Sequence, residues 1–138
     1  MDELIDSAEG AKELKNIRYN GKNNNDNYSD DRIGNSTGCT ANVALITEKK
    51  IYVANAGDSR SVLCRGGNTL PLSEDHKPES PNEEKRITNA GGQITMGRVN
   101  GGLNLTRSMG DFDYKRKSDL PYDQQMITCK PDVREVNR

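Results

Sequence analysis

The amino-acid sequence predicts an α+β fold whose strands pair in antiparallel fashion. Two β-prone runs, residues 38–47 and 51–56, are separated by only three charged residues. This spacing is typical of a β-hairpin, because a short turn can join two antiparallel strands. A third short apolar run follows at residues 61–64, and apolar residues at helical spacing precede the strands at 2–17. We therefore expect a small antiparallel sheet accompanied by helices.

Two segments have the sequence features of helices. The spacing in residues 2–17 predicts one amphipathic helix that packs on the sheet and is weakly interrupted at Gly10. A second helix is expected to begin at Ser80-Pro81-Asn82-Glu83, a capping box with proline at the first helical position. Gly91 marks its end. The charged run at 83–86 is expected to face solvent.

The apolar residues are few and are concentrated in one part of the chain. They make up 31% of the 138 residues and gather mainly in residues 38–65. The side chains expected to form a buried hairpin face are Val43, Leu45, Val53, Val62 and Leu63. Such a core is local and is not expected to close on itself.

Charge, hydropathy and cysteine spacing exclude several classes of function. The chain has 20 Lys plus Arg and 21 Asp plus Glu, so it offers no strong field to nucleic acid or an anionic membrane. No apolar run approaches the ~18 residues of a membrane span, and the N-terminus lacks a signal-peptide core. Cys39, Cys64 and Cys129 lack zinc-site spacing. We expect buried, reduced thiols in an intracellular compartment, the cytoplasm or nucleus.

Each residue that could take part in catalysis or ligand binding has two interpretations when it is considered alone. Gly57 is expected to let the backbone bend at a strand boundary where a Cβ would clash. Asp58 follows it, and an aspartate at such a place more commonly fixes a turn than binds a ligand. His76, the single histidine, could be a general acid, but a loop histidine is usually solvated or hydrogen-bonded. A nucleophile pair with Cys39 is weaker, because Cys39 is expected to be buried.

Several stretches in order carry a more specific signal. They are GCTA at 38–41, VANAGDSR at 53–60, DHKP at 75–78, RI at 86–87, NAGG at 89–92, RVNG at 98–101 and RSMGDFDYK at 107–115. Together they resemble the metal-dependent protein serine/threonine phosphatases of type 2C. The agreement covers the whole chain, with a polar, Asn-rich insertion at 20–36.

The resemblance implies an antiparallel β-sandwich flanked by helices, present here as an incomplete domain. The implied map is a helix at 1–19, a polar insertion loop at 20–36, core strands at 37–74, a flap region at 75–111, and a loop with further strands at 112–138. In this family, a water activated by Mn²⁺ or Mg²⁺ hydrolyses phosphoserine or phosphothreonine in proteins. Phosphoproteins are thus the implied partners of a monomeric hydrolase, without nucleic acid or membrane.

The resemblance also implies roles for single residues. Asp58 matches an aspartate of a third, weaker metal position, and Thr40 a threonine beside the metal-bound waters. Arg98 matches a flap arginine that faces the phosphosubstrate. No residue of the chain is assigned as catalytic. The positions interpreted as structural are Asp75, His76, Arg107 and Asp111.

Other family motifs are absent from the sequence. These are an N-terminal arginine with a Glu-Asp pair, an Asp-Gly-His-Gly stretch, and later Asp-Gly-x-x-Asp and Asp-Asn motifs. We therefore expect a fragment that lacks the main metal ligands and is inactive alone. Strands at 39–47, 51–56 and 126–136 should lack neighbours and expose apolar faces.

Two alternatives to the phosphatase interpretation remain open. One is a non-catalytic relative that binds phosphoproteins or acts as a decoy, since the flap region is retained. The other is an α/β domain in which Asp58 only shapes a turn.

Overall fold

The structure is a computed structural model that describes residues 1–19 and 35–138. Its helices are α1 (Asp2–Ile5), α2 (Ala8–Tyr19) and α3 (Pro81–Asn89), with 3-10 turns η1 (Phe112–Tyr114) and η2 (Tyr122–Gln124). Its strands are β1 (Gly38–Cys39), β2 (Ala41–Ile46), β3 (Lys50–Ala56), β4 (Val62–Arg65), β5 (Asn68–Pro71), β6 (Ile94–Thr95), β7 (Arg98–Val99), β8 (Met109–Gly110) and β9 (Asp132–Asn137). The predicted insertion at 20–36 lies almost wholly outside the described residues. Within these ranges, no helix has the length and apolarity needed to cross a membrane.

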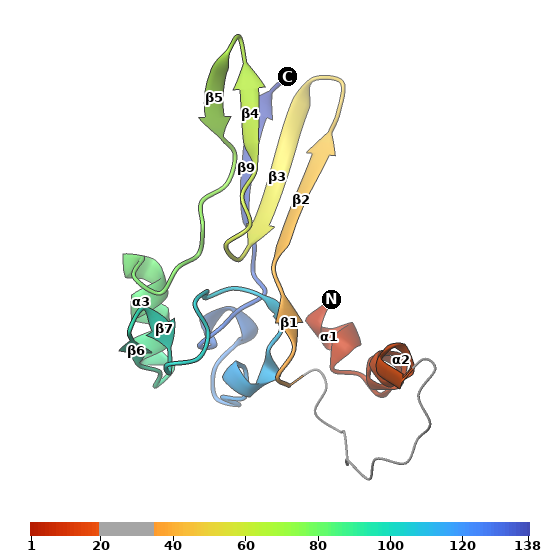
Figure 1. Ribbon diagram of the computed structural model, residues 1–138, viewed down its shortest axis with the longest axis vertical. Coiled ribbons are helices and arrows are strands. Elements are labelled where there is room, and N and C mark those ends of the chain that lie inside the picture. Colours follow the sequence, from red (N-terminus) through yellow and green to blue (C-terminus); the bar gives the residue numbers. More distant parts are fainter. Residues whose placement is uncertain (20–34) are drawn as a thin grey trace.

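The predicted hairpin is confirmed as β2 and β3, which stand side by side in the upper half of Figure 1. Their antiparallel register runs from Ala41 opposite Ala56 to Ile46 opposite Ile51. Thr47 closes the turn, because its backbone N–H and its hydroxyl both donate to the Lys50 carbonyl, at 2.8 and 2.9 Å. β9 pairs with the other side of β3, so the order is β2-β3-β9. The expectation that 51–56 would lack a neighbour is therefore wrong.

The remaining strands form two-stranded antiparallel ribbons. β4 pairs with β5, β6 with β7, and β1 with β8. The β4–β5 hairpin points the same way as the β2-β3-β9 sheet, and α3 lies with β6 and β7 at the other end of the molecule (Figure 1). The predicted α+β class with antiparallel pairing is confirmed, and the sandwich is incomplete.

The main apolar core lies at α3 and not on the hairpin. Ile87, Val99 and Ile127 are fully buried there, with Leu103 and Met126 packed against them. Such packing joins α3 to β7 and to the segment before β9.

The expected buried face of the hairpin is largely wrong. Val53 is buried, but Val43 is 62%, Leu45 60% and Val62 57% exposed. The register gives the cause, because Val43 and Leu45 lie on the face of the sheet opposite to Val53. Val62 belongs to the separate ribbon of β4 and β5, so these side chains do not form one common face. The predicted exposure of apolar faces is confirmed for β2.

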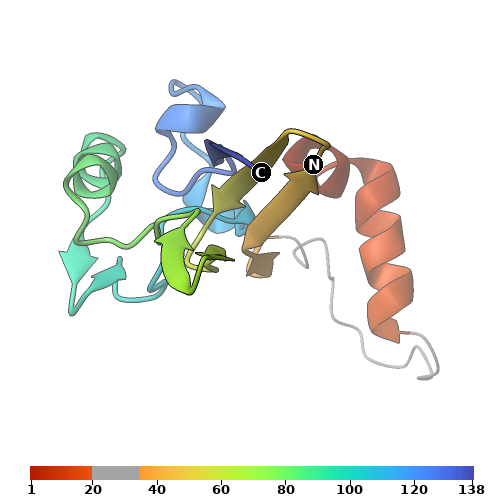
Figure 2. The same cartoon turned by 90° about the horizontal axis from the view of Figure 1, so that it is seen from above.

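The N-terminal segment forms two helices instead of one. The helix is interrupted at Ser7, whose hydroxyl donates to the Leu4 carbonyl at 2.6 Å and accepts from the Gly10 N–H at 3.0 Å. The Ser7 side chain thus caps the N-terminus of α2, and the interruption of the helix lies before Gly10 and not at it. Leu4 and Ile17 are 57% and 65% exposed, and α2 lies to one side of the molecule (Figure 2). The expected packing of this stripe on the sheet is wrong.

The three cysteines are free, but they are not buried as expected. Cys39 and Cys64 are exposed, and Cys129 is half-buried. β1 and β4 belong to narrow two-stranded ribbons, which leave their side chains open to solvent. Burial raises the pKa of the Cys129 thiol, and the nearby Asp2 carboxylate acts in the same direction. This places the thiol further from its reactive thiolate form.

Candidate functional site

The end of β3 holds the turn on which the candidate site depends. Gly57 has φ +118°, a conformation that residues with a Cβ rarely adopt. A Cβ at this position would collide with the Thr40 side chain and the Arg107 carbonyl. The predicted requirement for glycine is therefore confirmed, and the next residue, Asp58, is projected from a tightly packed turn.

Buried hydrogen bonds hold the backbone of this turn on both sides. The Gly57 N–H donates to Nδ1 of His76 at 3.1 Å, and the His76 N–H donates back to the Gly57 carbonyl at 3.0 Å. Asn55, only 1% exposed, donates from Nδ2 to the same carbonyl at 3.0 Å and to the Glu74 carbonyl at 2.9 Å. His76 is 4% exposed, so the hydrogen-bonded interpretation of this histidine is correct.

The second ring nitrogen of His76 connects the Gly57 turn to β9. Nε2 of His76 lies 3.1 Å from Oδ2 of Asp132. Nδ1 lies 3.1 Å from both the nitrogen and the carbonyl oxygen of Gly57. In the tautomer in which Nδ1 accepts from the Gly57 N–H, Nε2 carries the proton and donates it to Asp132. Oδ1 of Asp132 accepts from Nη1 of Arg107 at 2.7 Å. Burial opposes ionisation of Asp132, but the bonds from Arg107 and His76 outweigh it and lower its pKa.

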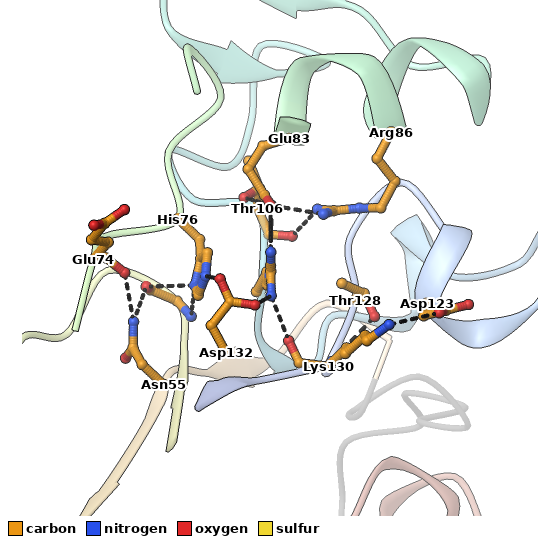
Figure 3. Close-up of polar contacts among 12 residues, drawn as sticks. Asn55, Glu74, His76, Glu83, Arg86, Thr106, Asp123, Thr128, Lys130 and Asp132 are labelled. Carbon is orange, nitrogen blue, oxygen red and sulfur yellow. Dashed lines mark hydrogen bonds and ion pairs between the residues drawn. The ribbon is translucent and has the colours of Figure 1, made fainter. Parts of the chain in front are cut away.

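Arg107 in turn joins a buried cluster at the start of α3. Figure 3 labels three other members of this cluster, Glu83, Arg86 and Thr106. Glu83 is 3% exposed and accepts from Arg107 at 2.7 Å and from the Thr106 hydroxyl at 2.5 Å. It also forms an ion pair with Arg86, whose Nη1 lies 2.7 Å from Oε2 of Glu83. Burial raises the pKa of Glu83, but these donors outweigh burial, and the net effect is a lowered pKa. The result is a buried carboxylate that stays ionised between two guanidinium groups.

This cluster corrects two predictions from the sequence. Ser80 makes no side-chain capping bond, and Glu83 turns toward the core instead of back to Ser80. Arg86 is also largely buried, donating to the carbonyls of Thr106 at 2.7 Å and Gln125 at 3.1 Å. Burial lowers the pKa of Arg86. The run at 83–86 is thus only partly a solvated face, because partners 20 or more positions away hold two of its charged side chains in the interior.

Two of the three predicted site residues meet at the Gly57 turn: Asp58 is part of it, and Thr40, between β1 and β2, contacts it. The Thr40 hydroxyl is 2.7 Å from the Ser59 hydroxyl, and its methyl group packs against Gly57. The Asp58 side chain is 25% exposed, and its Oδ2 accepts from Nζ of Lys77 at 2.5 Å. Arg98 is exposed and donates to the Gly102 carbonyl at 2.7 Å. Arg98 therefore bonds to the turn that directly follows its own strand, β7.

The residues described do not make a divalent metal site by themselves. Within 1–19 and 35–138, no three His, Cys, Asp or Glu side chains are grouped so that they could hold an ion. Asp58 offers hard oxygen ligands of the kind that Mg²⁺ and Mn²⁺ prefer, but an ammonium group already lies on one of them. Asp58 would need further ligands to form such a site.

The network contains residues that sequence reasoning did not single out. Asn55 and Asp132 carry no local signal, since a polar residue at a strand end is usually solvated. Asn55 is nevertheless buried beside Asn42, whose Nδ2 donates to the Asn55 Oδ1 at 2.9 Å. The one sequence signal for this network was the DHKP match at 75–78, because the family resemblance assigned His76 a structural role.

Residues 2–138 match the family model for protein phosphatase 2C. The chain belongs to the protein phosphatase 2C family. Among its relatives, Protein phosphatase 2C 1 of Paramecium tetraurelia is 49% identical over 136 residues. That alignment covers 99% of this chain and 42% of the relative, so the chain spans less than half of that protein.

Solved structures agree with membership of the 2C family. A phosphatase from a pathogenic strain of Toxoplasma gondii matches with a TM-score of 0.63 at 40% identity, covering 64% of this chain and 28% of that one. A Caenorhabditis elegans sex-determining protein matches with a TM-score of 0.67 at 25% identity, covering 99% of this chain and 28% of that one. The resemblance noted in the sequence is confirmed, and with it the incomplete 2C fold.

Proposed function

We propose that this chain is part of a protein serine/threonine phosphatase. It supplies the Gly57 turn, which carries Asp58, and the flap region at 75–111. The observation that carries the proposal is the Gly57 turn, which buried groups hold from both sides while the Asp58 carboxylate stays within reach of solvent. A rigid turn with an accessible carboxylate suits a ligand for a hard cation.

The proposed reaction is hydrolysis of phosphoserine or phosphothreonine in proteins. Mn²⁺ or Mg²⁺, when bound, would activate the attacking water and offset charge on the phosphoryl oxygens. Asp58 would give one ligand, and Thr40 would hydrogen-bond water beside it. We propose that the other ligands lie in the part of the family domain that this chain does not span. The isolated 138 residues are then inactive, and their free cysteines suit a reducing, intracellular compartment.

A chimera tests this proposal directly. Residues 1–138 would replace the matching segment of the Paramecium phosphatase 2C 1, and a phosphothreonine peptide would be the substrate with Mn²⁺ present. We expect turnover from the chimera and none from the 138 residues alone. Asp58→Asn in the chimera should raise the Mn²⁺ concentration needed for half-maximal rate. Metal-dependent turnover by the isolated chain, abolished by Asp58→Ala, would contradict the incomplete site.

A second candidate function is phosphoprotein binding without catalysis. The observation that favours it is the exposed guanidinium of Arg98, which among the described residues donates only to the backbone carbonyl of Gly102, in the turn after β7. A guanidinium in this state can still bind phosphate through its other N–H groups. A phosphopeptide should then bind the isolated chain more tightly than its unphosphorylated form, and Arg98→Ala should remove the difference. Equal binding of the two peptides argues against this function.

A further inference from the structure

A pocket of about 210 Å³ lies between α3 and the loop at 120–124, separate from the Gly57 turn. The helical positions that line it follow the i, i+3, i+4, i+7 spacing, which places side chains on one face of a helix. We refer to this pocket as the α3 groove. Its lining residues are Asn82, Lys85, Arg86, Asn89, Leu120 and Gln124.

The α3 groove offers positive charge and hydrogen-bond donors. The described residues that line it include two cations and three amides but no carboxylate. Arg86 is already paired with Glu83 (Figure 3), whereas no ion pair joins Lys85 to another residue of the described ranges. Asp123, beside Gln124, is paired with Lys130 at 3.0 Å. The exposed ammonium of Lys85 is therefore the charge that the groove leaves free for an anion.

A buried amide holds the loop wall of the groove in place. Gln125 is 6% exposed and accepts through Oε1 from the Lys117 N–H at 3.0 Å. Its Nε2 donates to the carbonyls of Lys117 and Leu120, both at 2.7 Å. Nε of Arg86 donates to the Gln125 carbonyl at 3.1 Å, which ties the helix to the loop. The two walls are thus fixed before a ligand binds, so binding loses less free energy to ordering.

A further cation lies near the end of the groove that Asn89 lines. Nζ of Lys117 is 3.9 Å from the position that a Cβ would take on Gly91, directly after α3. A cation at a helix C-terminus offsets the partial negative charge of the last carbonyls. Asp119, in the same loop, is exposed and does not line the groove. This end of α3 therefore does not repel an incoming anion.

We propose that the α3 groove is a docking site for an acidic peptide segment of a protein partner, and that it takes one carboxylate or phosphate group of that segment. Lys85 attracts the group, the amides of Asn82, Asn89 and Gln124 donate hydrogen bonds to its oxygens, and Leu120 contacts the apolar part of the side chain. The chain has 20 basic and 21 acidic residues, so its positive potential is local and suits a single acidic side chain better than nucleic acid. The groove shares no residue with the Gly57 turn, so the inference does not depend on the role of Asp58.

Fluorescence anisotropy of labelled peptides with the 138-residue chain tests the proposal. A glutamate-rich peptide should bind more tightly than its glutamine twin, and its affinity should fall as salt is added. Lys85→Glu should weaken that binding about tenfold, because it replaces attraction by repulsion. Lys85→Arg keeps the charge and should stay within about threefold of the parent affinity. Lys49→Glu makes the same reversal in the exposed β2–β3 turn and should leave the affinity unchanged.

A third peptide, with one phosphoserine and no other acidic residue, distinguishes the two sources of the anionic group. The peptide that loses more affinity in Lys85→Glu carries the group that the groove prefers. Arg98→Ala should not change the loss caused by Lys85→Glu, which separates this site from the phosphoprotein binding considered for Arg98. If Lys85→Glu weakens neither peptide more than Lys49→Glu does, the α3 groove is not a docking site.

A nuclear magnetic resonance titration needs no substitution and so does not depend on how variants fold. Addition of the glutamate-rich peptide should shift the side-chain amide resonances of Asn82, Asn89 and Gln124. The side-chain amide of Asn68, on β5, is the internal control and should not shift. Peptide binding that shifts other resonances while those three stay fixed would overturn the proposal.

Discussion

The central sheet and the region around α3 organise their residues in opposite ways. In the sheet, β3 pairs along its length with both β2 and β9, yet Leu45 and Val133 are 60% and 66% exposed. Around α3, the strands β6 and β7 pair over only two residues, yet Ile87 is completely buried. The region with the most regular backbone hydrogen bonding is thus not the region that buries the apolar side chains. Strand pairing alone does not bury a side chain.

The two regions also differ in where they keep their charges. The sheet carries exposed pairs such as Lys50 with Glu135, at 2.8 Å, which contribute little to stability. The α3 region encloses Glu83 between Arg86 and Arg107, where each charge depends on its partners. We therefore expect the α3 region to respond most strongly to substitution, and the sheet least.

The largest effect is expected from Glu83→Gln. It removes the negative charge and leaves Arg86 and Arg107 largely buried without their shared partner. The free energy of unfolding should fall by about 3–5 kcal/mol, as for a broken buried ion pair. Glu84→Gln is the control, because Glu84 lies beside it on α3 but is exposed. Urea unfolding followed by circular dichroism measures both, and similar losses would show that the cluster is not a stabilising unit.

The next effect separates the two apolar regions directly. Ile87→Ala removes a side chain that is fully buried, and should cost about 2–5 kcal/mol through lost burial and the cavity left behind. Leu45→Ala removes a side chain of equal size that is 60% exposed, and should cost less than about 1 kcal/mol. The same unfolding assay compares them. A larger loss for Leu45→Ala would mean that the hairpin face is covered in solution.

A smaller effect concerns His76, which joins the two regions. His76→Asn places an amide oxygen near the Nδ1 position and can keep the bond from the Gly57 N–H, whereas His76→Gln keeps only a donor near Nε2 for Asp132. An unsatisfied buried N–H costs about 1–3 kcal/mol, so His76→Gln should be the less stable variant. Amide hydrogen exchange at Gly57 should be faster in His76→Gln. Equal exchange in both variants would show that Nδ1 does not hold the turn.

The sequence was sufficient to predict features that depend on near neighbours. The β2–β3 hairpin, the glycine at 57 and the end of α3 at Gly91 follow from local chain geometry. Glu83 was misinterpreted because the capping-box pattern considers only residues 80–83, whereas its partners Thr106 and Arg107 are 23 and 24 positions away. The burial of the hairpin face was overestimated for a related reason, since burial depends on which element covers a strand.

Only part of the candidate site could be predicted from the sequence. Asp58 was found through its motif, because strand periodicity gives a lone aspartate no special weight. Its contact with Lys77 was missed, since 19 residues separate them and only the fold brings them together. Long-range polar contacts of this kind are set by the arrangement of whole elements, to which local propensity contributes little.

The smallest effect is expected at the edge of the network, from Asp132→Asn. Hydrogen bonds from Arg107 and His76 lower the pKa of Asp132, but its side chain is 68% exposed, so solvent screens much of the interaction. The substitution should cost less than about 1 kcal/mol at neutral pH. A lowered pKa gives stability that is full above the unfolded pKa, near 3.8, and is lost as pH falls through the folded value. Thermal unfolding of parent and variant should therefore converge in acid, whereas a difference that persists there would mean that Asp132 acts through packing and not through its charge.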